Sequence, residues 1–248
     1  FDTLTAAENA GWARLLRESA TSRWAFLSPT YAEAATISLG PVDVLLFWQS
    51  DELVGVMPLQ RASGWLGRMG MREPVGRHMT DYFGLLARPG LQLDWRSLLL
   101  KAGVPCLYFT HLDESQSAHG LKGDSPKSGL RTCIHPAGGE AHWEWLRTRD
   151  KKLVSDTERR ERKLVTEHGP LLFEMQSTSP VLDLESLVSL KNAQYRRTGH
   201  EGGALLDPAN ACLLSRLMAS QDTNCQPRLS VLRCGEQVVA GHFGLQCG

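Results

Sequence analysis

VLLFWQSDELVGVMPLQ, from Val44 to Gln60, and SVLRCGEQVVAGHFGLQ, from Ser230 to Gln246, are the two stretches that decide the fold. Each carries alternating apolar residues on both sides of a short polar segment, which is typical of a β-hairpin. At a constant offset of 186 residues, Gly55 aligns with Gly241 and Gln60 with Gln246. This self-similarity predicts a duplicated α/β unit, although two unrelated hairpins can also align this well.

A similar order of elements leads into each hairpin. The helical spacing of Leu4, Trp12 and Leu16 predicts an opening helix, and Ser28 before Pro29 predicts the cap of a second helix. The remaining expected elements are a strand over Asp81–Ala87, a helix over Leu93–Gly103, a strand over Pro105–Leu112, a long charged helix over Glu140–His168, a strand over Leu171–Gln176, and helices over Leu184–Thr198 and Pro208–Ser220.

These elements predict a mixed α/β fold in two units. The chain has 248 residues, which is more than one domain of ordinary size usually needs. Turn-forming residues between Leu121 and Gly139 predict the connection, with a first unit over residues 1–139 and a second over residues 140–248. Because the chain begins with Phe1 rather than Met and stops directly after the second hairpin, we expect a longer natural chain and an incomplete second unit.

Composition limits the classes of function. The formal net charge is zero and the isoelectric point is near 7.2, which disfavours a general nucleic-acid binder. No apolar run approaches the length of a membrane span and no signal segment opens the chain, so we expect a cytoplasmic protein. The six cysteines lack C-x-x-C spacing, which predicts reduced thiols and no metal site.

Common catalytic motifs are missing from the sequence. The patterns for dinucleotide binding, P-loops, serine hydrolases and zinc proteases do not occur. Arg61–Leu66 comes closest to the acyl-CoA loop of acetyltransferases, but it lacks the small last residue and no helix is expected after it.

The first candidate site is the segment from Gln194 to Gly203, where a helix ends in a Gly-rich loop. Tyr195, Arg196 and Arg197 lie together there, and such residues can bind a carboxylate or phosphate and supply a phenol for proton transfer. Cationic residues also favour the C-termini of helices for electrostatic reasons alone, so a purely structural interpretation stays open.

Three further positions are candidates. Asp81 and Tyr82 follow His78 at a predicted strand entrance, where Asp81 is either a general base or the cap of a turn. His242 lies in the second hairpin where the alignment places Val56 in the first, and it is either structural or a titratable group near neutral pH. On the charged helix, Arg160 is either part of an anion-binding ridge or of a solvated face with mixed charges.

Seven segments in order resemble the CelD-like branch of the GNAT superfamily, whose members are often labelled cellulose-biosynthesis or BioF2-like acetyltransferases. They are the Trp12-x-x-Leu15 helix, FLSPTY from Phe26, GVMPLQ from Gly55, TDYFGLL from Thr80, RRERKLVTEHGPLLFE from Arg159, LKNAQYRRTG from Leu190 and VVAGHFGL from Val238. The resemblance implies tandem GNAT folds related to the FemABX peptidyltransferases, of which the first is degenerate.

The implied activity is acyl transfer from acetyl-CoA or another acyl-CoA to an amine or hydroxyl of a small-molecule or glycan acceptor, in polysaccharide or envelope biosynthesis. His242, Asp81 and Tyr195 are then the candidate catalytic groups, and the substrate-binding candidates are Tyr82, Arg196, Arg197 and Arg160. In a GNAT unit the strand and helix after the hairpin form the CoA site, so we expect the chain as it stands to bind acyl-CoA poorly. Two alternatives stay open, namely an aminoacyl-tRNA-dependent transferase of the FemABX type and a non-catalytic binding scaffold.

Overall fold

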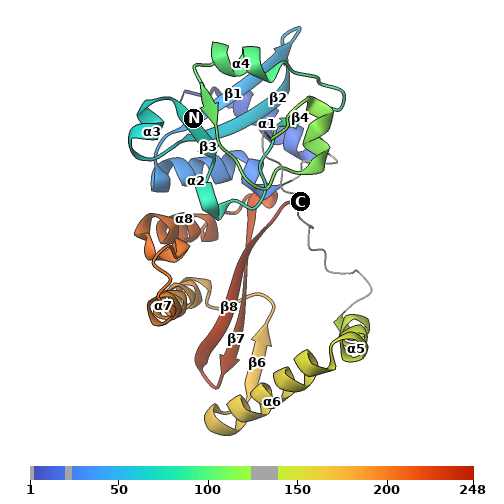
Figure 1. Cartoon of the computed structure of the whole chain (residues 1–248), viewed down its shortest axis with the longest axis vertical. Helices are drawn as coiled ribbons and strands as arrows, with labels where there is room; N and C mark the ends of the chain where they lie inside the picture. Colours follow the sequence, from blue (N-terminus) through green and yellow to red (C-terminus); the bar gives the residue numbers. More distant parts are fainter. Residues whose placement is uncertain (1–2, 20–23, 124–138) are drawn as a thin grey trace.

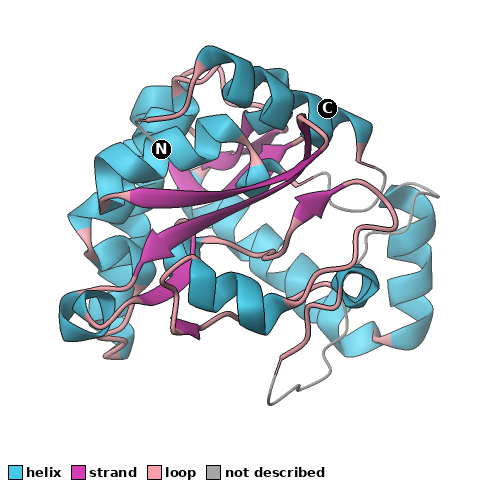
Figure 2. Cartoon of the chain, turned by 90° about the horizontal axis from the view of Figure 1, so that it is seen from above, coloured by secondary structure: helices cyan, strands magenta, loops and turns pink. Residues whose placement is uncertain are grey.

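A computed structural model describes residues 3–19, 24–123 and 139–248 of the chain, and it has a mixed α/β architecture (Figure 1). One sheet lies in the upper part of Figure 1 with the N-terminal helices beside it, and a second sheet extends below it. The view from above shows helices surrounding the strands on several sides (Figure 2). Predicted features that involve residues 124–138, among them Cys133, lie outside the described residues.

Two helices open the chain as the sequence predicts. Helix α1 spans Ala6–Glu18 and buries Trp12, Leu15 and Leu16. Thr5 and Glu8 form a capping box at its start. A 3-10 turn η1 (Ala25–Leu27) leads into α2 (Pro29–Leu39), and the Ser28 hydroxyl accepts the Tyr31 N–H at 3.0 Å. Ser28 is therefore the predicted N-cap.

The first hairpin consists of β1 (Val42–Gln49) and β2 (Glu52–Arg61). Its two-residue loop places Ser50 and Asp51 at φ values of 46° and 62°, which matches the turn type that suits twisted antiparallel strands. A bulge at Val54 leaves this residue without a partner in β1.

The strand after this hairpin is interrupted, which the sequence did not predict. We expected one strand over Asp81–Ala87, but β3 (Met71–Pro74) and β4 (Leu86–Ala87) both pair antiparallel with β2. Pro74 lies opposite Leu59 and Leu86 opposite Val56, so residues 75–85 leave the sheet between them. This excursion contains the 3-10 turn η2 (Arg77–Met79).

The remaining elements of the first unit are short. Helix α3 (Gly64–Arg68) begins inside the Arg61–Leu66 segment, where we expected no helix, and α4 (Trp95–Lys101) confirms the helix expected over Leu93–Gly103. The strand expected over Pro105–Leu112 is reduced to β5 (Cys106–Leu107), which runs parallel to β3 and is followed by a Phe83–Leu112 bridge. The 3-10 turn η3 covers Glu114–His119.

The charged segment forms two helices rather than the single helix predicted over Glu140–His168. Helix α5 spans Gly139–Arg149 and α6 spans Lys151–His168. Asp150 separates them because its carboxylate accepts the Leu153 N–H at 3.0 Å and caps α6. An N-cap residue has non-helical backbone geometry, so one continuous helix is excluded.

The second unit repeats the helix, helix, hairpin order. Strand β6 (Leu171–Glu174) precedes α7 (Pro180–Thr198), and α8 (Pro208–Met218) follows after the 3-10 turn η4 (Ala204–Leu206). The 3-10 turn η5 (Thr223–Cys225) then leads into the hairpin of β7 (Gln226–Cys234) and β8 (Gln237–Gln246). The sheet has the order β6-β7-β8 with antiparallel pairs.

The two hairpins correspond at an offset of 185 residues, and the predicted offset of 186 is wrong by one. Two-residue loops end at Glu52 and at Gln237, and the bulges lie at Val54 and Val239. Neighbouring residues of a strand point to opposite faces of the sheet. An alignment that is shifted by one residue therefore matches residues that lie on opposite faces. Met57, not Val56, is therefore the counterpart of His242.

A single apolar cluster joins the two units. Leu213 and Leu217 of α8 lie in the same buried cluster as Trp12 of α1 and Ala32 and Ala35 of α2. These alanines allow helices α2 and α8 to pack closely. The two units therefore share part of one core.

We expect Leu213→Ala to lower the free energy of unfolding by about 2–5 kcal/mol, because Leu213 is fully buried in this shared cluster. Chemical denaturation measures the change. Leu153→Ala is the matched control, since Leu153 is 51% exposed on α6 and its removal should change the value by at most about 0.5 kcal/mol. Equal effects of the two substitutions would contradict the shared core.

Candidate functional site at the junction of the two units

The excursion that interrupts the third strand forms an arm (residues 75–82) that reaches the second unit. Its first turn is fixed by Gly76 at φ 79°, where a Cβ would collide with the Tyr31 hydroxyl, and by Arg77 at φ 53°. The Gly76 N–H also donates to the Gln60 side chain at 2.9 Å. Glycine is required at this position because of both its conformation and the space available.

His78 on the arm contacts Asn210 on α8. Asn210 is buried, and its Nδ2 lies 2.7 Å from the Ala204 carbonyl and 3.2 Å from His78 Nε2. The Ala204 carbonyl oxygen can only accept, so the group of Asn210 that faces it must be the amide nitrogen. The same nitrogen donates to His78, and His78 Nε2 is therefore the acceptor. This contact connects the arm to the turn between α7 and α8.

The α7–α8 turn (residues 199–207) follows the Tyr195–Arg197 candidates. Gly199 ends α7 in a left-handed conformation, and Gly203 lies against the Tyr195 ring with no space for a Cβ. Lys191 lies 5.2 Å from the centre of that ring and the His200 ring 5.5 Å. Arg196 and Arg197 are exposed and form no ion pair with any described residue. Two exposed arginines without an ion pair to a described residue suit an anionic ligand.

Asp81 and Tyr82 close the arm. Asp81 is exposed, and Tyr82 stacks on Trp24 with ring centres 5.1 Å apart. The neighbouring Thr80 hydroxyl lies 2.9 Å from the hydroxyl of buried Tyr31. Burial raises the pKa of Tyr31 well above its ordinary value, and the charge of Asp81 contributes in the same direction. The fold thus links Asp81 and Tyr82 to the turn after Tyr195 through His78 and Asn210.

His242 and Arg160 lie elsewhere. His242 pairs with Ser230 across the second hairpin, and it is exposed on the sheet face opposite to α7, because its neighbour Gly241 lies against Leu187 of α7. Arg160 is exposed on α6. Through the His78–Asn210 contact, the structure connects the arm with Asp81 and Tyr82 to the turn that follows Tyr195, Arg196 and Arg197, and His242 and Arg160 take no part in this connection.

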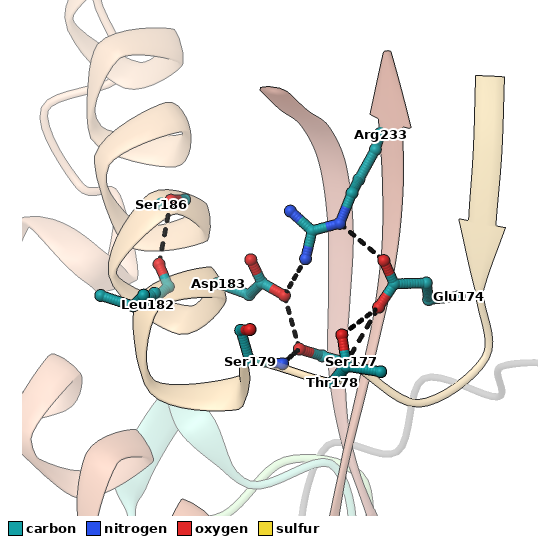
Figure 3. Close-up of polar contacts among 8 residues, drawn as sticks. All are labelled: Glu174, Ser177, Thr178, Ser179, Leu182, Asp183, Ser186 and Arg233. Atoms are coloured by element: carbon teal, nitrogen blue, oxygen red, sulfur yellow. Dashed lines mark hydrogen bonds and ion pairs between the residues drawn. The ribbon is translucent and has the colours of Figure 1, made fainter. Parts of the chain in front are cut away.

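A second polar site joins three segments that are far apart in the sequence (Figure 3). Arg233 of β7 donates from Nε to Glu174 at 2.6 Å and from Nη2 to the buried carboxylate of Asp183, which also accepts the Ser177 hydroxyl. Hydrogen bonding from Arg233, and next from the Thr178 N–H, holds the pKa of Glu174 below its ordinary value. A groove of about 860 Å³ lies beside this site between α7 and the β7–β8 loop.

Sequence reasoning missed this network, because isolated charged residues on β6, α7 and β7 give no spacing signal. In the structure the guanidinium bonds two carboxylates from different elements, so it ties α7 to the sheet.

Three further observations on the described part of the chain concern metal ligands, cysteines and membrane spans. No group of three or more His, Cys, Asp or Glu side chains there is placed to hold a metal ion. The cysteines of residues 3–19, 24–123 and 139–248 are free, and Cys225 and Cys234 are buried. No helix in these ranges is long and apolar enough to cross a membrane.

One known family matches part of the chain. The family described as an acetyltransferase (GNAT) domain matches residues 151–248, from the first residue of α6 through β8. The match supports the GNAT superfamily. No match to the chain was found among curated proteins or among solved structures. Acyl transfer is therefore the general chemistry that this part of the chain supports, and GNAT acetyltransferases use an acyl-CoA as co-substrate.

The Arg233 network makes a prediction about pH. The stabilisation from Glu174 is present above the pKa of this carboxyl in the unfolded chain, and it is lost as the pH falls through the lower pKa of the folded state. Arg233→Met removes the cause of the low pKa. We expect a lower melting temperature at about pH 7 and a shallower decrease between about pH 5 and pH 2 than in the unsubstituted protein.

Thermal unfolding across this pH range measures the effect. Arg228→Met is the control, because Arg228 lies on the same strand and, among the described residues, bonds only the side chains of Gln226 and Gln246. Parallel curves for Arg233→Met and the unsubstituted protein would contradict the assigned cause.

Proposed function

We propose that the protein transfers an acyl group from acetyl-CoA or a similar thioester to an amine or hydroxyl of an anionic acceptor. The observation that carries the proposal is the GNAT acetyltransferase match over residues 151–248. The described elements of this range run in the order helix, strand, helix, helix and hairpin, so the match covers several packed elements and not an isolated motif.

The second unit is the proposed catalytic unit. In the first unit, the strand after the hairpin is broken by the arm. The adjacent β5 pairs with β3 before the break, and a separate bridge joins Phe83 to Leu112 before the chain returns to the sheet at β4. If a strand N–H is to polarise the thioester carbonyl, that N–H must be free of a partner in the neighbouring strand. The interrupted and paired strand of the first unit favours a supporting role for this unit.

The proposed acceptor site lies at the junction. Arg196 and Arg197 are exposed cations that suit a phosphate or carboxylate of the acceptor, and Tyr195 is a phenol beside them. Asp81 is exposed on the arm, which contacts α8 through His78, so it is our first candidate for the base that removes the acceptor proton. His242 on the open face of β8 is the second candidate, and it would act on an acceptor bound to that face.

Polysaccharide or envelope metabolism is the proposed setting for the reaction, on the basis of the resemblance to CelD-like proteins. A tRNA-dependent transferase is less favoured, because the formal net charge is zero. A non-catalytic binding scaffold is the competing proposal. The interruption between β3 and β4 supports this alternative for the first unit only.

Calorimetric titration of the full natural chain with acetyl-CoA tests the donor. We expect one-to-one binding that free CoA competes away, and no comparable binding of ATP. Absence of heat together with absence of competition by CoA would reject the thioester proposal and favour the scaffold.

Arg196→Ala/Arg197→Ala tests the acceptor site with inorganic pyrophosphate as the probe. Loss of two charge-assisted contacts should weaken pyrophosphate binding at least about tenfold. Arg68→Ala/Arg96→Ala removes two exposed arginines from the first unit and should leave binding unchanged. Equal affinities of both double variants would refute the site.

A further inference from the structure

We propose that His78 and Asn210 form a latch through which the first unit positions the α7–α8 turn and thereby sets the affinity of the second unit for its anionic acceptor. The part of this inference that concerns the acceptor rests on the function proposed above. The part that concerns the latch rests on geometry alone.

The arm is rigid enough to act as a positioning element. Gly76 is clamped between Tyr31 and Gln60, and the Tyr31 and Thr80 hydroxyls lie 2.9 Å apart within the core. Arg77 keeps a left-handed backbone that is unfavourable for a residue with a Cβ, so the surrounding contacts must enforce it. His78 is therefore presented by a fixed loop.

Asn210 transmits the position of the arm to the turn. Its amide group donates to the Ala204 carbonyl within the turn and to His78 on the arm, and the residue is 2% exposed. A buried amide N–H that loses its partner is desolvated without a compensating hydrogen bond, which is unfavourable. The arrangement in which Asn210 contacts both Ala204 and His78 is therefore favoured. One side chain thus couples a first-unit residue to the backbone of the turn.

Met79 supplies an apolar contact beside the latch. It packs against both the cluster shared by the two units and the cluster beneath α7 and β8. The turn itself is held mostly by local bonds, such as Gly203 N–H to the His200 carbonyl and Leu206 N–H to the Gly203 carbonyl. The orientation of the turn then depends on contacts outside it, which are the packing of Leu205 against the cluster beneath α7 and β8 and the contacts with Asn210 and Tyr195.

Amide hydrogen exchange on the whole protein tests the latch. His78→Ala should speed exchange of residues 199–207 about two- to tenfold, as expected for one lost hydrogen bond, while residues 226–246 stay unchanged. His78→Gln should restore protection, because its side-chain carbonyl can accept from Asn210. His168→Ala, at the exposed end of α6, is the matched control.

Unchanged exchange of the turn in His78→Ala would overturn the latch, and so would a His78→Gln variant that behaves like His78→Ala. A rescue by glutamine is not expected of a residue that only fills space.

Titration with inorganic pyrophosphate tests the role in binding. We expect about two- to tenfold weaker binding in His78→Ala, normal binding in His78→Gln, and loss of the same binding in Arg196→Ala/Arg197→Ala. A looser turn with unchanged pyrophosphate affinity would overturn the role in acceptor binding. Neither measurement uses acetyl-CoA, so failure of the thioester proposal leaves the result on the latch intact.

Discussion

The packing of α2 against α8 is the contact on which the rest of the structure depends. Helix α2 covers the first sheet with one side and meets Leu213 and Leu217 of α8 with the other, and its buried residues are mainly alanines and Tyr31. Small side chains let the two helices approach, and the gain from burying leucines against them is large. This packing places the arm of the first unit opposite the start of α8. The junction site exists only because these two helices are held together.

Much of the fold could be predicted from the sequence, since local signals decide it. Ser28 before Pro29, the alternating hairpins and the helical spacing around Trp12 each act over a few residues, and the structure contains the corresponding elements. The break at Asp150 was missed because a single aspartate in a charged helical segment has no distinctive pattern. The break in the third strand was missed because nothing in Val75–Tyr82 shows that the chain returns to pair with β2 at Leu86.

The candidate site was predicted in part for the same reason. A tyrosine and two arginines at a helix end form a local pattern, so Tyr195, Arg196 and Arg197 could be named in advance. Their connection to His78 through Asn210 spans 132 positions between the two contacting side chains, and no local pattern encodes such a contact. The Arg233 network is hidden in the same way, because its partners come from three elements.

The alignment by residue identity has an offset of 186 residues, and the alignment by the loops and bulges of the structure has an offset of 185. This difference changes how the two hairpins are related. Gly55 lies on the sheet face that carries Ala87 and Leu91. Gly241 lies instead on the face of its own sheet that is covered by a helix, beneath Leu187 of α7. Gln60 likewise points toward the helices, whereas Gln246 lies with Arg228 on the open face. The identical residues therefore have different neighbours in the two hairpins, and what the hairpins share in the structure is the loop, the bulge and the preceding order of elements. A role found for a residue of one hairpin passes to the other only through that structural correspondence.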